Sequence, residues 1–390
     1  MDKLTSRERV KMALNHQEPD RVPIDIGGGA STSIVVEGYE KLRDHLGLPA
    51  GKTKILSKAF RAAKIDEDVA KKLGVDIIPV NLKGGSKAQS GDSKNRDTFR
   101  DGWGVVWEKV ANPYGYYWEV AVPPLKDAAI EDLEKHNWPD PEDPKRIEGL
   151  AEEVKYLYQN TDYALMGGPV FKSLWELAYM LRGFDTLLMD LYLNPDFVHA
   201  LFRKITDINK KVTDKYLKVV GRYIQVVRGA DDLATQDGLL FSPEMYRKFI
   251  KPYQAEYFAF VKERTNAKVF YHSCGDVGPL INDLIEIGVD VLNPVQVSTK
   301  TLGDTARLKE EFGDRISFWG GIDTQEVLPA GSPEQVEEEI KRRIKDLGPG
   351  GGYVVASVHN IQPDVPAENI CRMVEAAHRF GEYPVTTVRN

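Results

Sequence analysis

Short hydrophobic runs alternate with amphipathic stretches along most of this chain. Each run is rich in β-branched or aromatic residues and nearly continuous in its apolar character, which is typical of strands buried on both faces of a parallel sheet. The stretches between the runs have helical spacing, and those at 242–263 and 332–347 both open with Ser-Pro-Glu, a helix start signal. The eight predicted strands are residues 22–26, 75–80, 163–166, 223–227, 268–272, 289–293, 316–319 and 353–358.

Eight strands that alternate with helices predict a (β/α)8 barrel, an α/β fold of the TIM type. The chain has 390 residues, a length that such barrels reach with insertions, and we expect residues 1–390 to form a single domain. One region breaks the alternation: residues 92–125 are rich in Trp and Tyr and predict an inserted antiparallel β-hairpin, whose turn contains Asn112, Pro113 and Gly115. This hairpin either covers the barrel mouth or packs on the outside, and the sequence favours neither placement.

Composition narrows the classes of function. The net charge of −7 argues against a nucleic-acid binder, which would normally be basic. No apolar run approaches the length of about 18 residues that suggests a membrane span, and the charged first residues do not resemble a signal peptide. Two cysteines, Cys274 and Cys371, are too few for a disulfide framework, so we expect a reducing, cytoplasmic location. Cys371 lies on the predicted inward face of the last helix and is expected to belong to the core.

Polar residues follow the predicted strands, and in a barrel the loops at these strand ends carry the active groups. Asp231 and Asp232 are suited to general acid/base catalysis, and the alternative is a helix cap or an ion pair with Arg228. Since neighbouring residues of an extended chain point in opposite directions, we expect only one of the two to face the pocket. The candidate substrate-binding residues are Asp25, Arg228, Asn293, Gln296 and Asp323, of which Asp323 has the alternative role of capping a turn.

Three consecutive glycines, residues 27–29, come shortly after Asp25. Because they carry no side chain, they either let a ligand approach the backbone closely or form a flexible loop. The segment does not match the glycine spacing of phosphate-binding loops.

His272 and Cys274 form the sharpest local signal, at the end of the fifth predicted strand. Imidazole and thiolate are ligands that zinc prefers, and a catalytic zinc site uses three protein ligands and keeps one position open. His359 ends the eighth predicted strand and is the candidate for the third ligand. The alternative is a histidine and a thiol that bind substrate without a metal.

Several segments of the chain resemble the uroporphyrinogen decarboxylase superfamily. They include TSRERVKMALNHQEPDRVPID at the start, FYHSCGDVGPLINDLIEIGVDVLNPVQ around His272 and Cys274, SPEMYRKFIKPY, and FWGGIDTQEVLPAGSPEQVEEEI. The resemblance covers residues 4–380 and implies a distorted (β/α)8 barrel, in agreement with the strand pattern.

Two branches of this superfamily imply different chemistry. True uroporphyrinogen decarboxylases carry an arginine-rich segment after the first strand, which holds the carboxylates of the substrate. Here that segment reads DIGGGASTSIV and has no arginine, which argues against porphyrin decarboxylation. The corrinoid-linked methyltransferases carry a zinc site made of a His-x-Cys pair and a late cysteine. This chain is similar to them at His272 and Cys274, but it has His359 where the late cysteine is expected.

The leading hypothesis from the sequence is therefore a zinc-assisted methyltransferase that acts with a separate corrinoid protein. The chain lacks the DxHxxG corrinoid motif, so cobalamin would arrive only on that partner. With one thiolate in place of two, the zinc would be more positive, which suits the activation of a methyl donor such as a methyl ether, and a thiol or another acceptor is the alternative. The alternatives are a decarboxylase or lyase of the same superfamily, and a barrel that binds a small molecule without catalysis. Barrels often form homodimers, and the sequence leaves the oligomeric state open.

Overall fold

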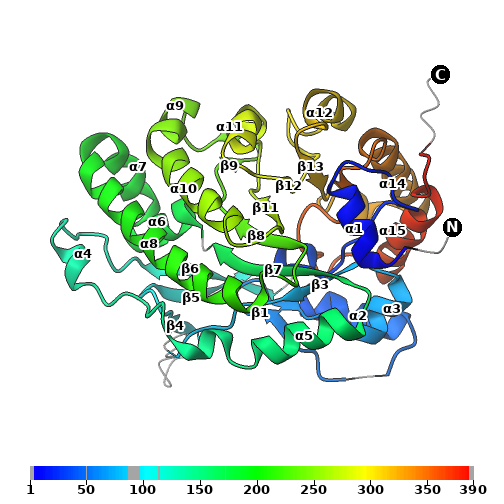
Figure 1. Ribbon diagram of the computed structural model, residues 1–390, viewed down its shortest axis with the longest axis horizontal. Coiled ribbons are helices and arrows are strands. Elements are labelled where there is room, and N and C mark those ends of the chain that lie inside the picture. Colours follow the sequence, from blue (N-terminus) through cyan, green and yellow to red (C-terminus); the bar gives the residue numbers. More distant parts are fainter. Residues whose placement is uncertain (1–3, 50, 87–96, 113–114, 172, 386–390) are drawn as a thin grey trace.

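Seven parallel strands form the centre of the molecule, curled into a barrel wall (Figure 1). The computed structural model describes residues 4–49, 51–86, 97–112, 115–171 and 173–385. In spatial order the strands are β14 (Tyr353–Val354), β13 (Ser317–Trp319), β12 (Val291–Asn293), β11 (Lys268–His272), β8 (Val226–Ala230), β7 (Ala164–Phe171) and β3 (Ile77–Val80). Apart from the extension of β7, each lies within a few residues of a predicted strand.

The first predicted strand joins the two edges of this sheet. Val355 donates its backbone N–H to Pro23 and Asp25 donates to Val355, both at 2.9 Å, while Asp76 donates to Ile24 at 2.9 Å on the other side. The segment contains a single parallel bridge, between Ile24 and Val355, so its pairing is shorter than predicted. These bonds close the wall into an eight-membered barrel and confirm the predicted fold class.

Helices surround the barrel and bury their apolar faces against it. The start signals seen in the sequence are used: Ser332 caps its helix in a capping box with Gln335, and Ser242 caps another at Met245. The helices are α1 (Ser6–Ala13), α2 (Val36–His45), α3 (Glu67–Leu73), α4 (Asp132–Lys135), α5 (Leu150–Asn160), α6 (Leu174–Arg182), α7 (Phe184–Leu193), α8 (Pro195–Val220), α9 (Pro243–Met245), α10 (Lys251–Lys262), α11 (Ile281–Glu286), α12 (Thr305–Phe312), α13 (Val327–Ala330), α14 (Pro333–Leu347) and α15 (Ala367–Phe380). Among the residues placed in the structure, no helix is long and apolar enough to span a bilayer.

Helix α1 closes the N-terminal end of the barrel. Arg7 donates its backbone N–H to Asp162, which precedes β7, and Gly352, which precedes β14, donates to Ala13. Val10 and Leu14 belong to the apolar cluster that fills the barrel interior at the N-terminal ends of the strands. The opposite end, at the C-terminal ends of the strands, is therefore the end left for a site.

The predicted hairpin is a three-stranded antiparallel sheet made of β4 (Thr98–Arg100), β5 (Val106–Asn112) and β6 (Gly115–Val122). Pro113, part of the predicted turn, lies outside the described residues, as do residues 92–96. The Tyr117 hydroxyl donates to Gln362 at 3.1 Å, and the Arg61 guanidinium lies 4.6 Å from the centre of the Tyr116 ring. The sheet thus contacts the loop after β14 at the barrel mouth, which favours the first of its two expected placements.

Candidate metal and active site

Strand alternation directs a set of polar side chains into the barrel. Two apolar clusters lie on the two sides of the barrel wall. The cluster inside the barrel contains Val226, Phe270 and Val291. The outer cluster, between the wall and the helices, contains Val227, Tyr271 and Leu292. Because side chains alternate along a strand, the residues two positions after the interior ones also face inward. They are Arg228 of β8, His272 of β11 and Asn293 of β12. Asp25 faces the same interior, between Ile24 and Ile26 of the outer cluster.

His272, Cys274 and His359 come together at the mouth. One nitrogen of each imidazole and the thiol sulfur all lie within 4.8 Å of one another. His272 Nε2 is 3.3 Å from Cys274 Sγ, and the two imidazole ring centres are 5.5 Å apart. One sulfur and two imidazole nitrogens that face one another form a donor set suited to zinc. The three residues could therefore hold a metal ion.

Asn293 selects the tautomer of His272. The Asn293 amide NH2 donates to the Trp319 carbonyl at 3.0 Å, which orients the amide oxygen toward the imidazole. His272 Nδ1 lies 2.6 Å from that oxygen and must be the donor, because an amide oxygen only accepts. The lone pair is then on His272 Nε2, the atom that faces Cys274. A metal-binding histidine is usually held in this way by its second nitrogen.

Burial favours the neutral forms of all three groups. It lowers the pKa of His272, and it lowers the pKa of His359 to about 4, with a smaller contribution from the charge of His272. It raises the pKa of the Cys274 thiol well above its usual value, and the negative charges of Asp232 and Glu176 add to this effect. Neutral imidazoles are ready to bind a metal, whereas the thiol would have to release its proton on binding.

The adjacent carboxylates have different surroundings, as the alternation rule predicts. Asp231 is fully buried and accepts hydrogen bonds from the first N–H groups of α6, at 3.1 Å from Leu174, 3.0 Å from Trp175 and 3.0 Å from Glu176. This is the helix-cap alternative, and it leaves Asp231 out of the pocket. Asp232 is half-buried and accepts from the backbone N–H of Cys274 at 2.7 Å, so it holds the loop that carries the thiol.

Two further candidates position loops. Gln296 accepts from the Gly275 N–H at 2.7 Å and so fixes the residue after Cys274. Asp323 accepts from the N–H groups of Gln325, Glu326 and Val327 at 3.0 to 3.1 Å, so it caps the turn that leads into α13. Asp323 thus takes the turn-capping role, the alternative to substrate binding that the sequence left open.

The glycines after Asp25 make room for neighbouring side chains. Gly27 has φ +96°, and a Cβ there would lie 2.3 Å from Ile65; a Cβ on Gly29 would lie 3.0 Å from Arg228 Nε. Asp25 itself is fully buried and accepts from Gly28 N–H at 2.7 Å and from the Trp319 indole at 3.0 Å. Burial raises its pKa to about 6. The loop is therefore closely packed, and not the flexible alternative.

Sequence reasoning missed Glu176 and Phe60. Glu176 lies in the first turn of α6, and burial together with Asp232 and Asp231 raises its pKa to about 8. Phe60 packs edge-on against His359, with ring centres 6.0 Å apart. The place of Glu176 just after a strand end was a usable signal, whereas no pattern in the sequence marked Phe60. Cys371 is half-buried on α15 and contributes to the edge of the core.

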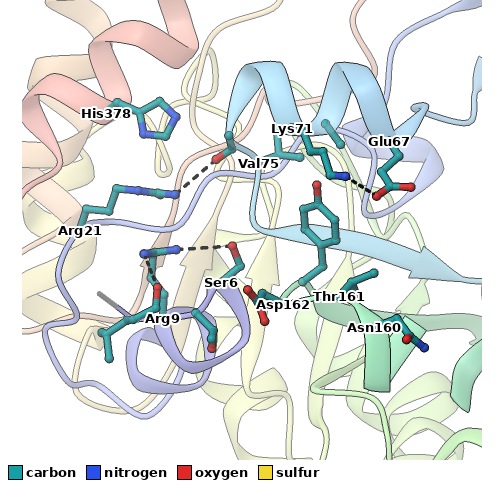
Figure 2. A pocket seen from close by; sticks show the side chains of 15 residues that line it. Ser6, Arg9, Arg21, Glu67, Lys71, Val75, Asn160, Thr161, Asp162 and His378 are labelled. Carbon is teal, nitrogen blue, oxygen red and sulfur yellow. Dashed lines mark hydrogen bonds and ion pairs between the residues drawn. The ribbon is translucent and has the colours of Figure 1, made fainter. Parts of the chain in front are cut away.

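A separate pocket of about 700 Å³ lies at the opposite end of the barrel (Figure 2). It is lined by residues that precede strands, such as Val75 before β3 and Tyr163 before β7, and by Arg9 of α1. Figure 2 shows Arg9, Arg21 and His378 on one side of it, with Lys71 and Glu67 paired on the other. In barrels this end contributes to stability, so we place the chemistry at the mouth.

Residues 116–380 match the family model described as uroporphyrinogen decarboxylase (URO-D). A uroporphyrinogen decarboxylase from Coxiella burnetii (strain RSA 331 / Henzerling II) is 29% identical over 230 residues, which are 55% of this chain and 59% of that protein. The chain thus spans less than two thirds of that relative. One from Alkalilimnicola ehrlichii is 28% identical over 269 residues, 66% of this chain and 68% of that protein. The solved structure of a methyltransferase from Methanosarcina mazei has a TM-score of 0.63 at 20% identity over 97% of this chain and 99% of that one, which shows a shared fold.

Proposed function

Because this chain belongs to the uroporphyrinogen decarboxylase family, we propose that it is a zinc-assisted methyltransferase that acts with a separate corrinoid protein. The observation that carries the proposal is the convergence of His272, Cys274 and His359 at the barrel mouth. A barrel that served only to bind a small molecule would not need a thiol and two neutral imidazoles within 4.8 Å of one another. A corrinoid would come with the partner protein, and not with this chain.

The residues present fit a catalytic zinc ion. Three protein ligands leave a fourth position for substrate, and the hydrogen bond from His272 to Asn293 already points His272 Nε2 toward the group. Zinc held there would act as a Lewis acid on an oxygen or sulfur of the substrate. With Cys274 as the one thiolate, the ligand set carries one negative charge, so zinc keeps a net positive charge. Such a centre suits a methyl ether oxygen better than a thiol acceptor.

In the proposed direction, the bond between the ether oxygen and the methyl carbon breaks. A corrinoid on the partner protein would supply the acceptor for the methyl group, and the oxygen that loses the methyl group would need a proton. Glu176 is suited to supply that proton, because it lies beside Asp232 and its pKa of about 8 keeps it protonated at neutral pH. Asp232 and Gln296 hold the loop of Cys274 in place during the reaction.

Decarboxylation of a carboxylated substrate is the second candidate, and the names of the curated relatives favour it. Its support in this chain is Arg228, which lies against Gly29 in the loop where the decarboxylase branch is expected to carry its arginines. A single arginine at this loop is a weak match to a substrate with many carboxylates. Methyl transfer is therefore the better-supported function.

Zinc content of the purified protein tests the site. We expect about one zinc per chain in the wild type, and loss of most of it in Cys274→Ala and His359→Ala. Cys371→Ala and His45→Ala are matched controls, since they remove a cysteine and a histidine elsewhere and should keep the metal. Asn293→Ala should weaken zinc binding by about 10- to 100-fold, because it frees the second nitrogen of His272. Asn369→Ala, which removes a buried amide bonded to Leu328 and Gly331, should not.

Activity is tested by mixing the zinc-loaded protein with a reduced corrinoid protein and a panel of methyl ethers. Conversion of reduced cobalt to methyl-cobalt is followed by its visible spectrum. Absence of zinc from every sample, even after reconstitution under reducing conditions, would overturn the proposal. Carbon dioxide release from uroporphyrinogen by the metal-free protein would then establish the second candidate.

A further inference from the structure

Arg228 stands apart from the other buried arginines. Among the described residues, five arginines are at least 91% buried, and the other four each have a carboxylate oxygen within 3.0 Å. Those four are Arg9 with Asp76, Arg43 with Asp66, Arg182 with Asp190, and Arg343 with Glu339. Arg228 is 9% exposed, and its guanidinium forms no ion pair or hydrogen bond with any residue that the structure describes. A buried charge without a partner is costly, so its retention calls for a ligand.

The guanidinium of Arg228 faces the barrel mouth. Its strand neighbour Val226 belongs to the interior cluster, so Arg228 points inward, and its Nε lies 3.0 Å from the position that a Cβ on Gly29 would take. Its nitrogens are not among the fully enclosed, unpartnered atoms of the described chain, so they border space that solvent reaches. Arg228 is paired with Phe270 on β11, two residues before His272, which places it close to the candidate metal group. Burial lowers the pKa of Arg228 only to about 10, so it is charged at neutral pH.

Asp25 interacts with the charge of Arg228 through space but forms no ion pair or hydrogen bond with it. Asp25 directs its two oxygens to the Gly28 N–H and the Trp319 indole, and no oxygen of Asp25 is within ion-pair distance of Arg228. The backbone of Gly29 packs against the guanidinium, where a side chain would not fit, so this loop offers Arg228 no acidic side chain at that position. A planar guanidinium matches a planar carboxylate through two parallel hydrogen bonds. Asp25 lies close by and repels any anion, so a carboxylate with one negative charge is favoured over a phosphate dianion.

We propose that Arg228 binds a carboxylate group of the substrate, so that the preferred substrates are monoanionic carboxylic acids whose reacting atom reaches His272, Cys274 and His359. This inference rests on the proposed function for the reaction that follows, and on Arg228 alone for the binding. Arg228 is in this sense the specificity-determining residue of the site.

Binding is tested by the NMR signal of the Arg228 side-chain Nε–H, assigned by its loss in Arg228→Lys. Acetate should shift this signal in a saturable way, acetamide should leave it unchanged, and inorganic phosphate should bind more weakly than acetate. The acetate response should persist in Cys274→Ala, which separates anion binding from the metal proposal. No saturable shift with 0.1 M acetate, an equal response to acetamide, or tighter binding of phosphate would each overturn the inference.

The substrate preference of Arg228→Met gives a second test, which does not depend on the NMR signal of the arginine. This variant should keep its zinc and unfold at the same urea concentration as the wild type or a higher one, since it removes an unpaired buried charge. In the methyl-transfer assay, 4-methoxybenzoate should exceed 4-methoxybenzamide in kcat/KM by about 10- to 100-fold. Arg228→Met should abolish that preference and Arg222→Met, at an exposed position before β8, should keep it. A preference retained in Arg228→Met would contradict the assignment.

Discussion

At the scale of single residues, the site is distinguished by groups held in their neutral forms. Burial keeps His272 and His359 unprotonated and Cys274 protonated in the metal-free chain. Glu176 follows the same rule, and the carboxylates of Asp232 and Asp231 add to it. Groups with such displaced pKa values gather where chemistry is done.

Glu176 should therefore lower the stability of the chain as the pH rises. Its pKa is about 8 in the folded protein and ordinarily 4.5, so the folded state holds an extra proton between these values. The stabilisation from that proton is complete below about pH 4.5 and lost as the pH rises through 8. Between pH 5 and pH 8 the wild type should lose stability that Glu176→Gln does not lose. The difference between the free energies of unfolding of the variant and the wild type should therefore shift by about 1–3 kcal/mol in favour of the variant, as measured by urea unfolding in the presence of a chelator. Glu152→Gln, which changes an exposed first-turn glutamate of α5, is the control and should follow the pH dependence of the wild type. If the free energy of unfolding of Glu176→Gln had the same pH dependence as that of the wild type, the assignment would be contradicted.

At the scale of elements, one carboxylate joins a strand end to the start of a helix. Asp231 follows β8 and accepts three backbone N–H groups of α6, and Gln254 of α10 donates to it at 3.0 Å. Helix α6 has no hydrogen bond from its own N-cap side chain, so Asp231 replaces that cap from another element. The neighbouring Asp232 is thereby directed to the mouth.

Asp231→Ala should destabilise the protein by about 2–4 kcal/mol, because it leaves buried N–H groups of α6 and the Gln254 amide without an acceptor. Asp232→Ala should cost about 1 kcal/mol or less in stability, since it removes one acceptor at a half-buried site, yet it should impair methyl transfer. Urea unfolding followed by circular dichroism compares the two. A larger loss of stability in Asp232→Ala would show that the roles are reversed.

At the scale of the whole molecule, the barrel depends on its closure at the N-terminal end. Asp76, fully buried, accepts from Arg9 at 2.7 Å, from Arg21 at 2.7 Å and from the backbone of Ile24 at 2.8 Å. It thereby ties α1, the closing segment and β3 to one another. The closing segment has only one bridge of its own, so this network supplies much of its attachment.

Asp76→Ala should lower the free energy of unfolding by about 3–5 kcal/mol, because it leaves Arg21 and the buried Ile24 N–H without their acceptor and removes one of the two carboxylates of buried Arg9. Asp20→Ala is the matched control: Asp20 pairs with the same Arg9, but its side chain is 34% exposed, so the loss should be about 1 kcal/mol. Both variants should bind the zinc proposed for the mouth as the wild type does, since the mouth lies at the other end. Equal losses in the two variants would argue against a closing role for Asp76.

The sequence alone was enough to predict the barrel and to name His272 and Cys274, with His359 as the candidate third member, as a group that could hold a metal. Buried parallel strands must be apolar on both faces, so the eight runs were visible, and the ends of such strands collect at one rim, which placed His272, Cys274 and His359 together. It also limited Asp231 and Asp232 to one inward-facing residue, because the strand period is two.

Which candidates face the pocket and which support it depends on the packing of the whole chain. Asp231 and Asp323 became caps because the N–H groups that they accept come from chain segments whose positions no local pattern encodes. The significance of Glu176 and Arg228 also depended on distant neighbours: a pKa and an unpaired charge are set by burial and by which carboxylates lie nearby in space. Local periodicity determines which face a side chain takes, whereas its partners are determined by the packing of the whole chain.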